Sequence, residues 1–314
     1  MSVACVGILV ADVFANPIRR LPEPGELTTT SGFAMSVGGC AANTAVALRI
    51  LGREVSVAGK VGTDMFGDFV ISELARRGIG VEQIRRTAAL PTSRTIVFNV
   101  EGEDRRYLHC IGANGDLTLA DIYPSILDNT EVLYLGGHLA LPSLTARDAA
   151  TLFCEAKRRG ITTVLDVVMP AEKSFGIQNI APVLRYTDFF LPNEDEASRL
   201  TGARDAQLQA KCLGEINPEC AIVITRGPCG SVATRRNRTI VTPPFPMNSI
   251  DESGAGDAFV AGLIMGLFEG WDLERALLFA SAIGGSCTRA LGCYAGIFTF
   301  EEGCRFLEEQ NAVA

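Results

Sequence analysis

Short apolar runs rich in β-branched residues alternate along the chain with segments of helical spacing. The runs predict strands at residues 3–10, 54–58, 131–135, 162–166, 188–191 and 221–225. Between them, apolar residues recur with a helical period at residues 41–51, 66–77, 145–159, 195–200 and 258–268. Several strand candidates are apolar almost throughout, which is typical of a parallel sheet covered by helices on both faces. The pattern therefore predicts an open, doubly wound α/β sheet.

Two stretches interrupt this alternation. Residues 14–35 contain three prolines and a threonine run without a helical period. Residues 93–110 predict two strands, SRTIVFNV and RRYLHC, joined by the polar turn EGEDR. Together these stretches predict a small β flap beside the core. No internal repeat or linker divides the chain, so we expect residues 1–314 to form one domain.

Composition is that of a globular protein with a substantial core. Of the 314 residues 47% are hydrophobic and 32 are glycine. The net charge of −8 and the pI near 5.0 argue against nucleic acid or an anionic membrane surface as a partner, because either would need a basic face. We expect no signal peptide and no membrane span. The ten cysteines, without a CxxC pair, are expected to be reduced and mostly buried in a cytoplasmic protein.

Two common phosphate-binding motifs are missing from the sequence. Gly59 and Lys60 are followed by Val61, and no glycine stands five residues before Gly59, so this pair is not a P-loop. The first strand runs through VGILVAD without the GxGxxG turn of a dinucleotide-binding fold. A nucleotide would have to be bound by another device.

The stretch DESGAGDAF, residues 251–259, offers such a device. Gly254, Ala255 and Gly256 allow a tight turn that brings backbone N–H groups close to a ligand, just where an apolar helix begins. The unpaired amides and the positive end of that helix would form an anion hole. Asp257 at the same helix start could act as general base for a hydroxyl. Equally, Asp257 could be a helix cap behind a flexible turn.

A second glycine element precedes another helix. In VGGCAANTA, residues 37–45, the glycine pair ending at Gly39 admits a close ligand, and Asn43 offers both a donor and an acceptor to a polyol. Asp12 follows the first strand, where ligands of open α/β sheets usually bind. The plainer alternatives are a simple glycine turn with an exposed Asn43 and a loop or cap aspartate at Asp12.

Two further strand ends carry polar groups. In LPNEDEASRLTG, Asn193 and Glu196 could orient waters around Mg²⁺, which keeps much of its water shell. They could instead be an acidic helix start that suits the helix dipole. In VITRGPCGS, a strand ends in a turn with glycines at Gly227 and Gly230, which by itself indicates only a β-turn.

Together, four segments resemble the ribokinase-like, or PfkB, carbohydrate kinases. These are VGGCAANTAVALRILG (37–52), LPNEDEASRLTG (191–202), VITRGPCGS (223–231) and DESGAGDAFVAGL (251–263). Their order and approximate separations are those of the family, and the similarity spans nearly the whole chain. The pairing of GAGDAF with the early GG…N element is its most specific part.

The resemblance implies an α/β fold, a ribokinase-like three-layer α/β/α sandwich with a small β lid at about residues 14–35 and 93–111. It implies transfer of the γ-phosphate of ATP to a hydroxyl of a sugar or sugar-like molecule. By position, Asp257 resembles the catalytic base, and Gly254, Ala255 and Gly256 resemble the anion hole.

Binding roles are implied in the same way. Asp12, Gly39 and Asn43 fall where such kinases hold sugar hydroxyls. Asn193 and Glu196 match the NxxE element that organises Mg²⁺ and phosphates. The nucleotide-side turn of the family is matched by Thr225, Gly227 and Gly230. The lid of relatives often also forms a homodimer contact.

Two places depart from the family pattern. Glu252 stands where threonine is usual, beside the family's monovalent-cation (K⁺) site near Asp251 and Ser253. The segment VVMP after Asp166 lacks the asparagine or arginine of many members. Both departures bear on substrate and ion preference more than on reaction class.

Several alternatives stay open at this point. The acceptor could be a nucleoside, whose base would meet the lid residues Phe14, Phe33 and Phe98, although these aromatic residues also suit lid packing. A phosphosugar would need basic residues, and arginines lie in or near the lid at 19, 20, 94, 105 and 106. The chain could also be a sugar- or nucleotide-binding protein without catalysis. A redox enzyme that binds a dinucleotide is a third alternative, which the missing GxGxxG motif disfavours. His138 is either a substrate contact or a buried, hydrogen-bonded histidine.

Overall fold

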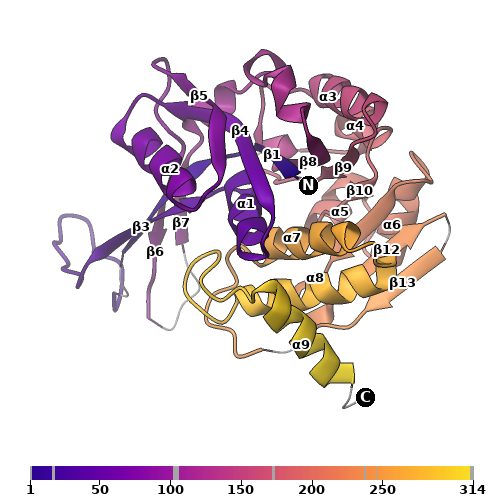
Figure 1. The fold of residues 1–314 in the computed structure, drawn as a ribbon. Coiled ribbons are helices and arrows are strands. Elements are labelled where there is room, and N and C mark those ends of the chain that lie inside the picture. Colours follow the sequence, from indigo (N-terminus) through magenta and orange to yellow (C-terminus); the bar gives the residue numbers. More distant parts are fainter. Residues whose placement is uncertain are drawn as a thin grey trace.

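A nine-stranded sheet forms the centre of the molecule in the computed structural model, which describes residues 2–15, 18–101, 106–171, 174–236, 238–245 and 247–311 (Figure 1). The strand order is β13-β12-β11-β10-β9-β8-β1-β4-β5. The strands are β1 Ser2–Gly7, β4 Glu54–Gly62, β5 Gly80–Thr87, β8 Thr130–Gly136, β9 Thr162–Leu165, β10 Phe189–Phe190, β11 Ala221–Thr225, β12 Ser231–Arg235 and β13 Arg238–Thr242.

Pairing is parallel from β5 to β11 and antiparallel from β11 to β13. Strand β1 lies between β4 and β8, with Val3 opposite Val55 of β4 on one side and Val132 of β8 on the other. Parallel neighbours carry their carboxyl ends to one edge of the sheet, so the loops that follow β1, β8, β9 and β11 meet there.

Helices cover both faces of the sheet. One face packs α1 Cys40–Ile50, α2 Met65–Arg76, α7 Ala255–Phe268, α8 Leu273–Cys287 and α9 Phe300–Asn311 in one apolar cluster. The other face packs α3 Ala146–Arg158, α4 Ala181–Leu184, α5 Glu194–Thr201 and α6 Ala206–Gly214 in a second cluster. The predicted three-layer α/β/α arrangement is therefore confirmed.

The pattern of the apolar run at residues 3–10 predicted one strand. This prediction is wrong, because the run divides between two strands. Strand β1 ends at Gly7, and β2 Val10–Ala15 belongs to a different sheet. Between the two strands, the Leu9 amide and carbonyl are both bonded by the buried side chain of Asn114, over 3.1 and 2.9 Å. Both strands are apolar, so composition alone does not mark the break.

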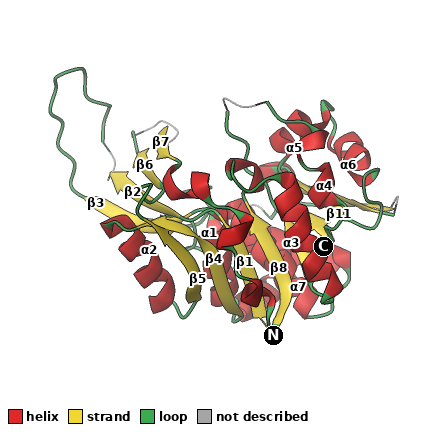
Figure 2. Ribbon diagram, turned by 90° about the horizontal axis from the view of Figure 1, so that it is seen from above, coloured by secondary structure: helices red, strands yellow, loops and turns green. Residues whose placement is uncertain are grey.

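A four-stranded sheet stands apart from the central one, in the order β3-β2-β6-β7 (Figure 2). It contains β2, β3 Phe33–Gly38, β6 Arg94–Phe98 and β7 Arg106–Cys110. Strands β6 and β7 pair antiparallel, with Thr95 opposite His109, as the two predicted strands required. Of the two segments that we predicted to form the flap, residues 16, 17 and 102–105 lie outside the described residues.

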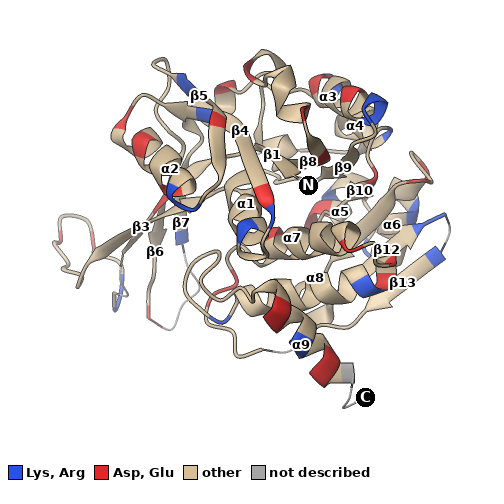
Figure 3. Cartoon of the chain, viewed as in Figure 1, with Lys and Arg blue, Asp and Glu red and all other residues tan. Residues whose placement is uncertain are grey.

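Charged side chains of both signs are interspersed on α2, α3 and α9 (Figure 3). Glu73 of α2 pairs with Arg76 at 2.8 Å, and Glu155 of α3 pairs with Arg159 at 2.9 Å. Lys60, buried in β4, pairs with Asp116 and Asp121, consistent with its exclusion from a P-loop. None of the helices in the described part of the chain is long and apolar enough to cross a membrane.

All ten cysteines carry free thiols. The prediction that most of them are buried is wrong, because two, Cys110 and Cys229, are exposed and four more are only partly covered. The fully buried ones are Cys5, Cys220, Cys287 and Cys293. The scattered positions of the cysteines in the sequence argued against disulfides. They could not tell which faces of the strands and helices the thiols occupy.

Candidate active site

The start of α7 presents free backbone amides. Gly254 adopts φ 75°, and a Cβ there would lie 2.7 Å from Cys293 Cβ, so glycine is required. The Ala258 amide is bonded to Gly254 O at 2.9 Å, and the Ala255 amide reaches Glu252 O at 3.3 Å. Among the described residues, the amides of Gly256 and Asp257 have no backbone partner. This first turn can therefore donate to an anion.

Asp257 is held in place by the helix opposite. Asn43 of α1 donates its Nδ2 hydrogen to Asp257 Oδ2 at 2.9 Å, and Thr44 Oγ1 donates to the Asp257 carbonyl at 3.4 Å. Burial raises the pKa of Asp257 from 3.8 to about 6, while the hydrogen bond from Asn43 acts to lower it. The carboxylate is thus mostly ionised near pH 7 and close to the range of an effective general base.

A cavity of about 160 Å³ opens at the carboxyl edge of the sheet beside Asp257. Its walls bring together six of the residues predicted from the sequence, namely Asn193, Glu196, Thr225, Gly254, Gly256 and Asp257. These residues come from α5, the end of β11 and the start of α7. Asn43 does not line the cavity but is hydrogen-bonded to Asp257, which does. The other predicted residues, Asp12, Gly39, Gly227, Gly230 and Ala255, do not line this cavity.

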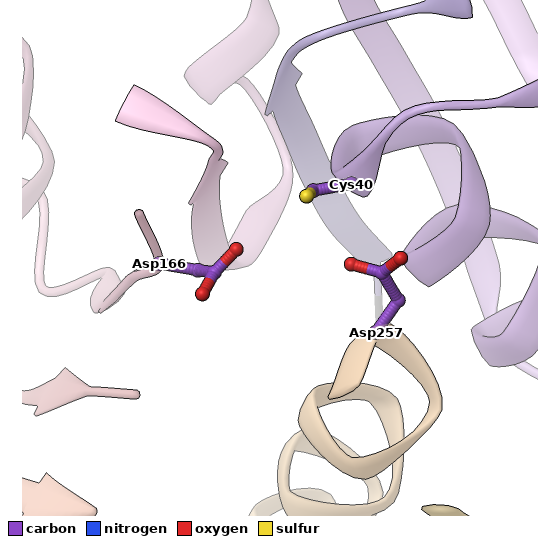
Figure 4. A group of neighbouring side chains, drawn as sticks. All are labelled: Cys40, Asp166 and Asp257. Carbon is purple, nitrogen blue, oxygen red and sulfur yellow. The ribbon is translucent and has the colours of Figure 1, made fainter. Parts of the chain in front are cut away.

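Two further side chains face Asp257 across the cavity (Figure 4). Cys40, the first residue of α1, and Asp166, which directly follows β9, each place a ligand atom within 4.8 Å of the Asp257 carboxylate and of one another. The Tyr134 hydroxyl donates to Asp166 Oδ2 at 3.3 Å. Burial, followed by the charges of Glu196 and Asp257, raises the pKa of Asp166 well above 3.8.

Sequence reasoning missed both of these residues. For Asp166 a signal was present, because a carboxylate that directly follows a buried parallel strand lies at the ligand-binding edge of the sheet. For Cys40 there was none, since a single cysteine beside a glycine pair reads as an ordinary buried thiol.

Asn193 and Glu196 form a reciprocal helix cap. Asn193 Oδ1 accepts from the Glu196 amide at 2.8 Å, and Glu196 Oε2 accepts from the Asn193 amide at 2.9 Å. The plainer of the two sequence interpretations, an acidic helix start, is therefore present in the structure. The Glu196 carboxylate can still bind a ligand while it caps the helix, because each carboxylate oxygen accepts more than one hydrogen bond. Burial, with the Asp257 charge adding to it, raises the pKa of Glu196 from 4.5 to about 7.

The set of donors fits a hard divalent cation. Carboxylates of Asp166, Glu196 and Asp257 face one cavity, and among the described residues that line it there is no lysine or arginine. The charges of Glu196 and Asp257 raise the pKa of Asp166, and the charge of Asp257 raises that of Glu196, so a cation between them would relieve their repulsion. Mg²⁺ prefers such oxygen ligands, and Asp166 and Glu196 would hold it. The sulfur of Cys40 is a soft donor and does not suit Mg²⁺.

Asp12 lies on β2 in the small sheet, directly against the glycine pair. A Cβ on Gly38 would collide with the Asp12 carboxylate, and a Cβ on Gly39, at φ 92°, would lie 2.5 Å from Ile8 O. The glycine pair thus lets β2 and the start of α1 approach each other. Burial raises the pKa of Asp12 from 3.8 to about 6.

A turn with two left-handed glycines follows β11. Gly227 has φ 50° and Gly230 has φ 80°, and a Cβ on Gly230 would collide with Thr242 O. The Arg226 amide donates to Gly230 O at 2.8 Å and closes the turn. Thr225 pairs with Asn193 in an isolated bridge, which joins this turn to the start of α5.

Comparison with known proteins assigns this arrangement to a family. The model described as pfkB family carbohydrate kinase matches residues 1–299. The chain belongs to this family. It is 28% identical over 303 residues to the 5-dehydro-2-deoxygluconokinase of Clostridium perfringens, covering 91% of this chain and 88% of that protein. It is 26% identical over 307 residues to the ribokinase of Haemophilus influenzae, covering 96% and 97%.

A solved structure shares the fold. The ribokinase of Arabidopsis thaliana complexed with ribose and ATP matches with a TM-score of 0.81 and 23% identity, over 98% of each chain. As a pfkB-family member, the chain is a sugar kinase, a phosphotransferase with an alcohol group as acceptor.

Of the two departures from the pfkB pattern, only the VVMP segment lines the cavity. Glu252 is exposed just before Gly254. Val167 and Val168 of the VVMP segment line the cavity next to Asp166. Beyond them, Arg199 of α5 donates to the carbonyls of Met169 and Pro170, over 3.0 and 2.9 Å, and fixes this loop.

Proposed function

We propose that this kinase transfers the γ-phosphate of ATP to a hydroxyl of a sugar or sugar acid. The observation that carries the proposal is the Asp257 carboxylate at the start of α7, beside the unpartnered amides of the same helical turn and aligned by Asn43. A general base and an anion site within one helical turn are the two elements that phosphoryl transfer to a hydroxyl needs.

Asp257 acts as the base in this proposal. Near pH 7 it is mostly ionised, because its pKa is about 6. As the acceptor oxygen forms its bond to the γ-phosphorus, the bond from phosphorus to the bridging oxygen of ADP breaks, and the hydroxyl proton passes to Asp257. Asn43 holds the carboxylate in one orientation throughout. Within the predicted Gly254, Ala255 and Gly256 turn, the unpartnered Gly256 amide, together with that of Asp257, stabilises the charge on the transferred group.

Asp166 and Glu196 hold Mg²⁺ in this proposal, with Asn193 orienting its water shell. Bound Mg²⁺ neutralises phosphate charge. Occupancy of the site also lowers the pKa of both carboxyls, since the positive charge favours their ionised forms.

The acceptor lies on the side of Asp12, Gly39 and Asn43, beneath the four-stranded sheet. Asp12 in its ionised form accepts hydrogen bonds from sugar hydroxyls, and Asn43 Oδ1, buried without a partner, is an acceptor in the same region. A free sugar or sugar acid is favoured over a nucleoside, because Phe33 of this sheet is 72% exposed and forms no enclosed base pocket.

Nucleotide binding falls to the opposite side of the cavity. Asn193 and Thr225 line it, and the Gly227 and Gly230 turn extends from Thr225. A monovalent cation such as K⁺ acts at the loop of Asp251, whose buried carboxylate already organises the loop by accepting from the Ser253 and Gly292 amides at 2.7 and 2.8 Å. Activity in K⁺ compared with Na⁺ tests this part of the proposal.

The four-stranded sheet is the lid and the homodimer contact of the proposed kinase. It closes over the acceptor and excludes water that would otherwise hydrolyse ATP. We infer a cytoplasmic location, where ATP is available and the ten free thiols stay reduced.

An ATP-coupled acceptor screen tests the proposed function. ADP formation is measured with ketohexoses, pentoses, sugar acids, nucleosides and sugar phosphates, each with and without Mg²⁺. We expect one strong, Mg²⁺-dependent signal among the sugars or sugar acids. A signal confined to nucleosides would contradict the acceptor class, and ADP formation by none of these acceptors would contradict catalysis.

A further inference from the structure

A second cavity, of about 490 Å³, lies on the α3 and α4 face of the sheet. It is walled by His138 and Leu141 after β8, by the first turn of α3, and by Phe175 and Gln178 before α4. This volume is in the range of small-molecule sites. None of its lining residues belongs to the cavity beside Asp257.

His138 lines this cavity and is 2% exposed, with neither ring nitrogen bonded to a described group. Burial lowers the pKa of His138 to about 4, so near pH 7 the ring is neutral, with one N–H donor and one acceptor. A buried polar group without a partner is costly, and such a group in a native protein calls for a ligand or an ordered water. The predicted burial of His138 is therefore confirmed, whereas no described residue supplies the predicted hydrogen bond to its ring.

The amino end of α3 faces the same cavity. Thr145 caps the helix by accepting from the Asp148 amide at 3.2 Å, while the Ala146 and Arg147 amides have no backbone partner among the described residues. Arg147 is exposed and adds a guanidinium. The negative charge of the Asp148 carboxylate would repel an anion here. This carboxylate already accepts hydrogen bonds from the Thr145 amide and hydroxyl, at 3.0 and 2.6 Å. The thirteen-residue helix thus supplies donors and a positive dipole end.

The remaining walls are apolar. Leu139, Leu141 and Leu144 are buried at the base of the cavity, and Phe175 and Pro182 close its side. Donors on one side and aliphatic walls on the other suit a molecule with one anionic head and a small apolar body. A bare inorganic anion would leave the apolar part unfilled.

We propose that this cavity is a second ligand site, for a small organic carboxylate. The carboxylate accepts from the Ala146 and Arg147 amides and the Arg147 guanidinium, His138 bonds the same head group, and the aliphatic body packs on the leucines. The proposal does not depend on the kinase reaction. The second cavity is nevertheless connected to the cavity beside Asp257, because the His138 amide donates to Asp166 O at 3.1 Å.

Histidine NMR tests the proposal directly, because His109 and His138 are the two histidines of the sequence. The full chain, labelled with ¹⁵N-histidine, is titrated with 4-methylpentanoate, and 4-methylpentanamide serves as the uncharged control. We expect the ring signals of His138 to move and saturate with the carboxylate alone, while those of His109, which lies in the small sheet, stay in place.

Charge reversal separates the site from general anion binding. Arg147→Glu should weaken 4-methylpentanoate by about tenfold or more, since a charge-assisted bond is lost. Arg204→Glu makes the same change at an exposed loop position outside the cavity and should leave affinity unchanged. His138 signals that do not move, or that move equally with the amide, would overturn the proposal. Equal affinity in the Arg147 variant would do the same.

Discussion

Asn43 Nδ2 donates to Asp257 Oδ2 over 2.9 Å and joins the first turns of α1 and α7 across 214 positions of sequence. The bond stabilises the ionised form of Asp257 and fixes its orientation towards the cavity. It also leaves Asn43 Oδ1 buried, with no hydrogen bond from any described residue, in the region proposed for the acceptor. One side chain thus aligns the proposed base and is placed to bind the substrate.

Asp257→Asn removes the proposed base but keeps the shape of the side chain. Turnover should fall by roughly two to four orders of magnitude, the usual contribution of a general base. ATP affinity, measured by calorimetry, should survive. Asp68→Asn, an exposed carboxylate in the first turn of α2, is the matched control and should keep wild-type turnover. Near-normal turnover of the Asp257 variant would remove this residue from the role.

Asn43→Ala should move the acid limb of the pH–rate profile to higher pH. Asp257 must be ionised to accept a proton, so activity falls as the pH drops through its pKa of about 6. Without the hydrogen bond from Asn43 the charged form loses stabilisation, and the pKa rises further. The measurement is kcat/KM against pH.

Thr44→Val is the control for that experiment, because the hydrogen bond from Thr44 to Asp257 goes to the backbone carbonyl and not to the carboxylate. Its acid limb should coincide with that of the wild type. An unchanged limb in the Asn43 variant would mean that the bond does not set the ionisation of Asp257.

Asp12→Asn should raise thermal stability at about pH 8, and this gain should shrink as the pH falls and vanish below pH 3.8. The pKa of Asp12 is raised from 3.8 to about 6 by burial, so the folded protein binds the proton more tightly than the unfolded chain. The stability supplied by the protonated carboxyl is therefore present below pH 3.8 and is lost as the pH rises through 6. Asparagine keeps the neutral state at every pH. The melting temperatures of the wild type and of Asp12→Asn, compared at each pH, test this prediction. A gain in stability that is equal at high and at low pH would contradict it.

The Cys40 thiol should react slowly with iodoacetamide. Burial and the nearby charges of Asp257 and Asp166 raise the pKa of Cys40 well above 9.0, so the reactive thiolate is scarce. The exposed thiols of Cys110 and Cys229 should be labelled first, with activity retained, when peptides are followed by mass spectrometry. The opposite order, in which Cys40 is labelled before Cys110 and Cys229 and activity is lost at the same rate, would contradict this prediction. It would show that Cys40 is accessible and that its pKa is not raised.

The exposed face of the small sheet should form the dimer contact. Phe33 is 72% exposed, Tyr107 57% and Leu108 63%, and β7 is exposed on both faces. An apolar, unpaired edge of this kind is typical of an association surface. Leu108→Asp should convert a dimer to a monomer in light scattering, whereas Leu208→Asp, equally apolar but on α6 and 50% exposed, should not. A wild-type monomer at micromolar concentration would refute the contact.

Local sequence predicted most of what is local in the structure. The strand at residues 221–225 and the helix starts near Cys40, Met65 and Ala146 were recovered because alternation and helical period are written in neighbouring residues. Glycines at 39, 227, 230 and 254 marked turns for the same reason, since each adopts a φ that other residues avoid. Helices α8 and α9 and strands β12 and β13 were not predicted.

Which groups meet was a matter of tertiary structure. Cys40, Asp166 and Glu196 stand far apart in the sequence, yet the parallel sheet carries their strand ends and helix starts to one edge, where they face Asp257. Burial there, and not residue type, shifts the pKa of each acid.

The sequence by itself determined the family and the reaction class, and it predicted Asp257 as the catalytic base, since these depend on residue types at fixed spacings. Only the tertiary structure decided that the run at 3–10 divides between two sheets, that Asp166 and Cys40 belong to the site, and that His138 is buried without a partner. The physical reason is the same in each case: pairing, proximity and desolvation are set by residues distant in the chain, so no local pattern records them.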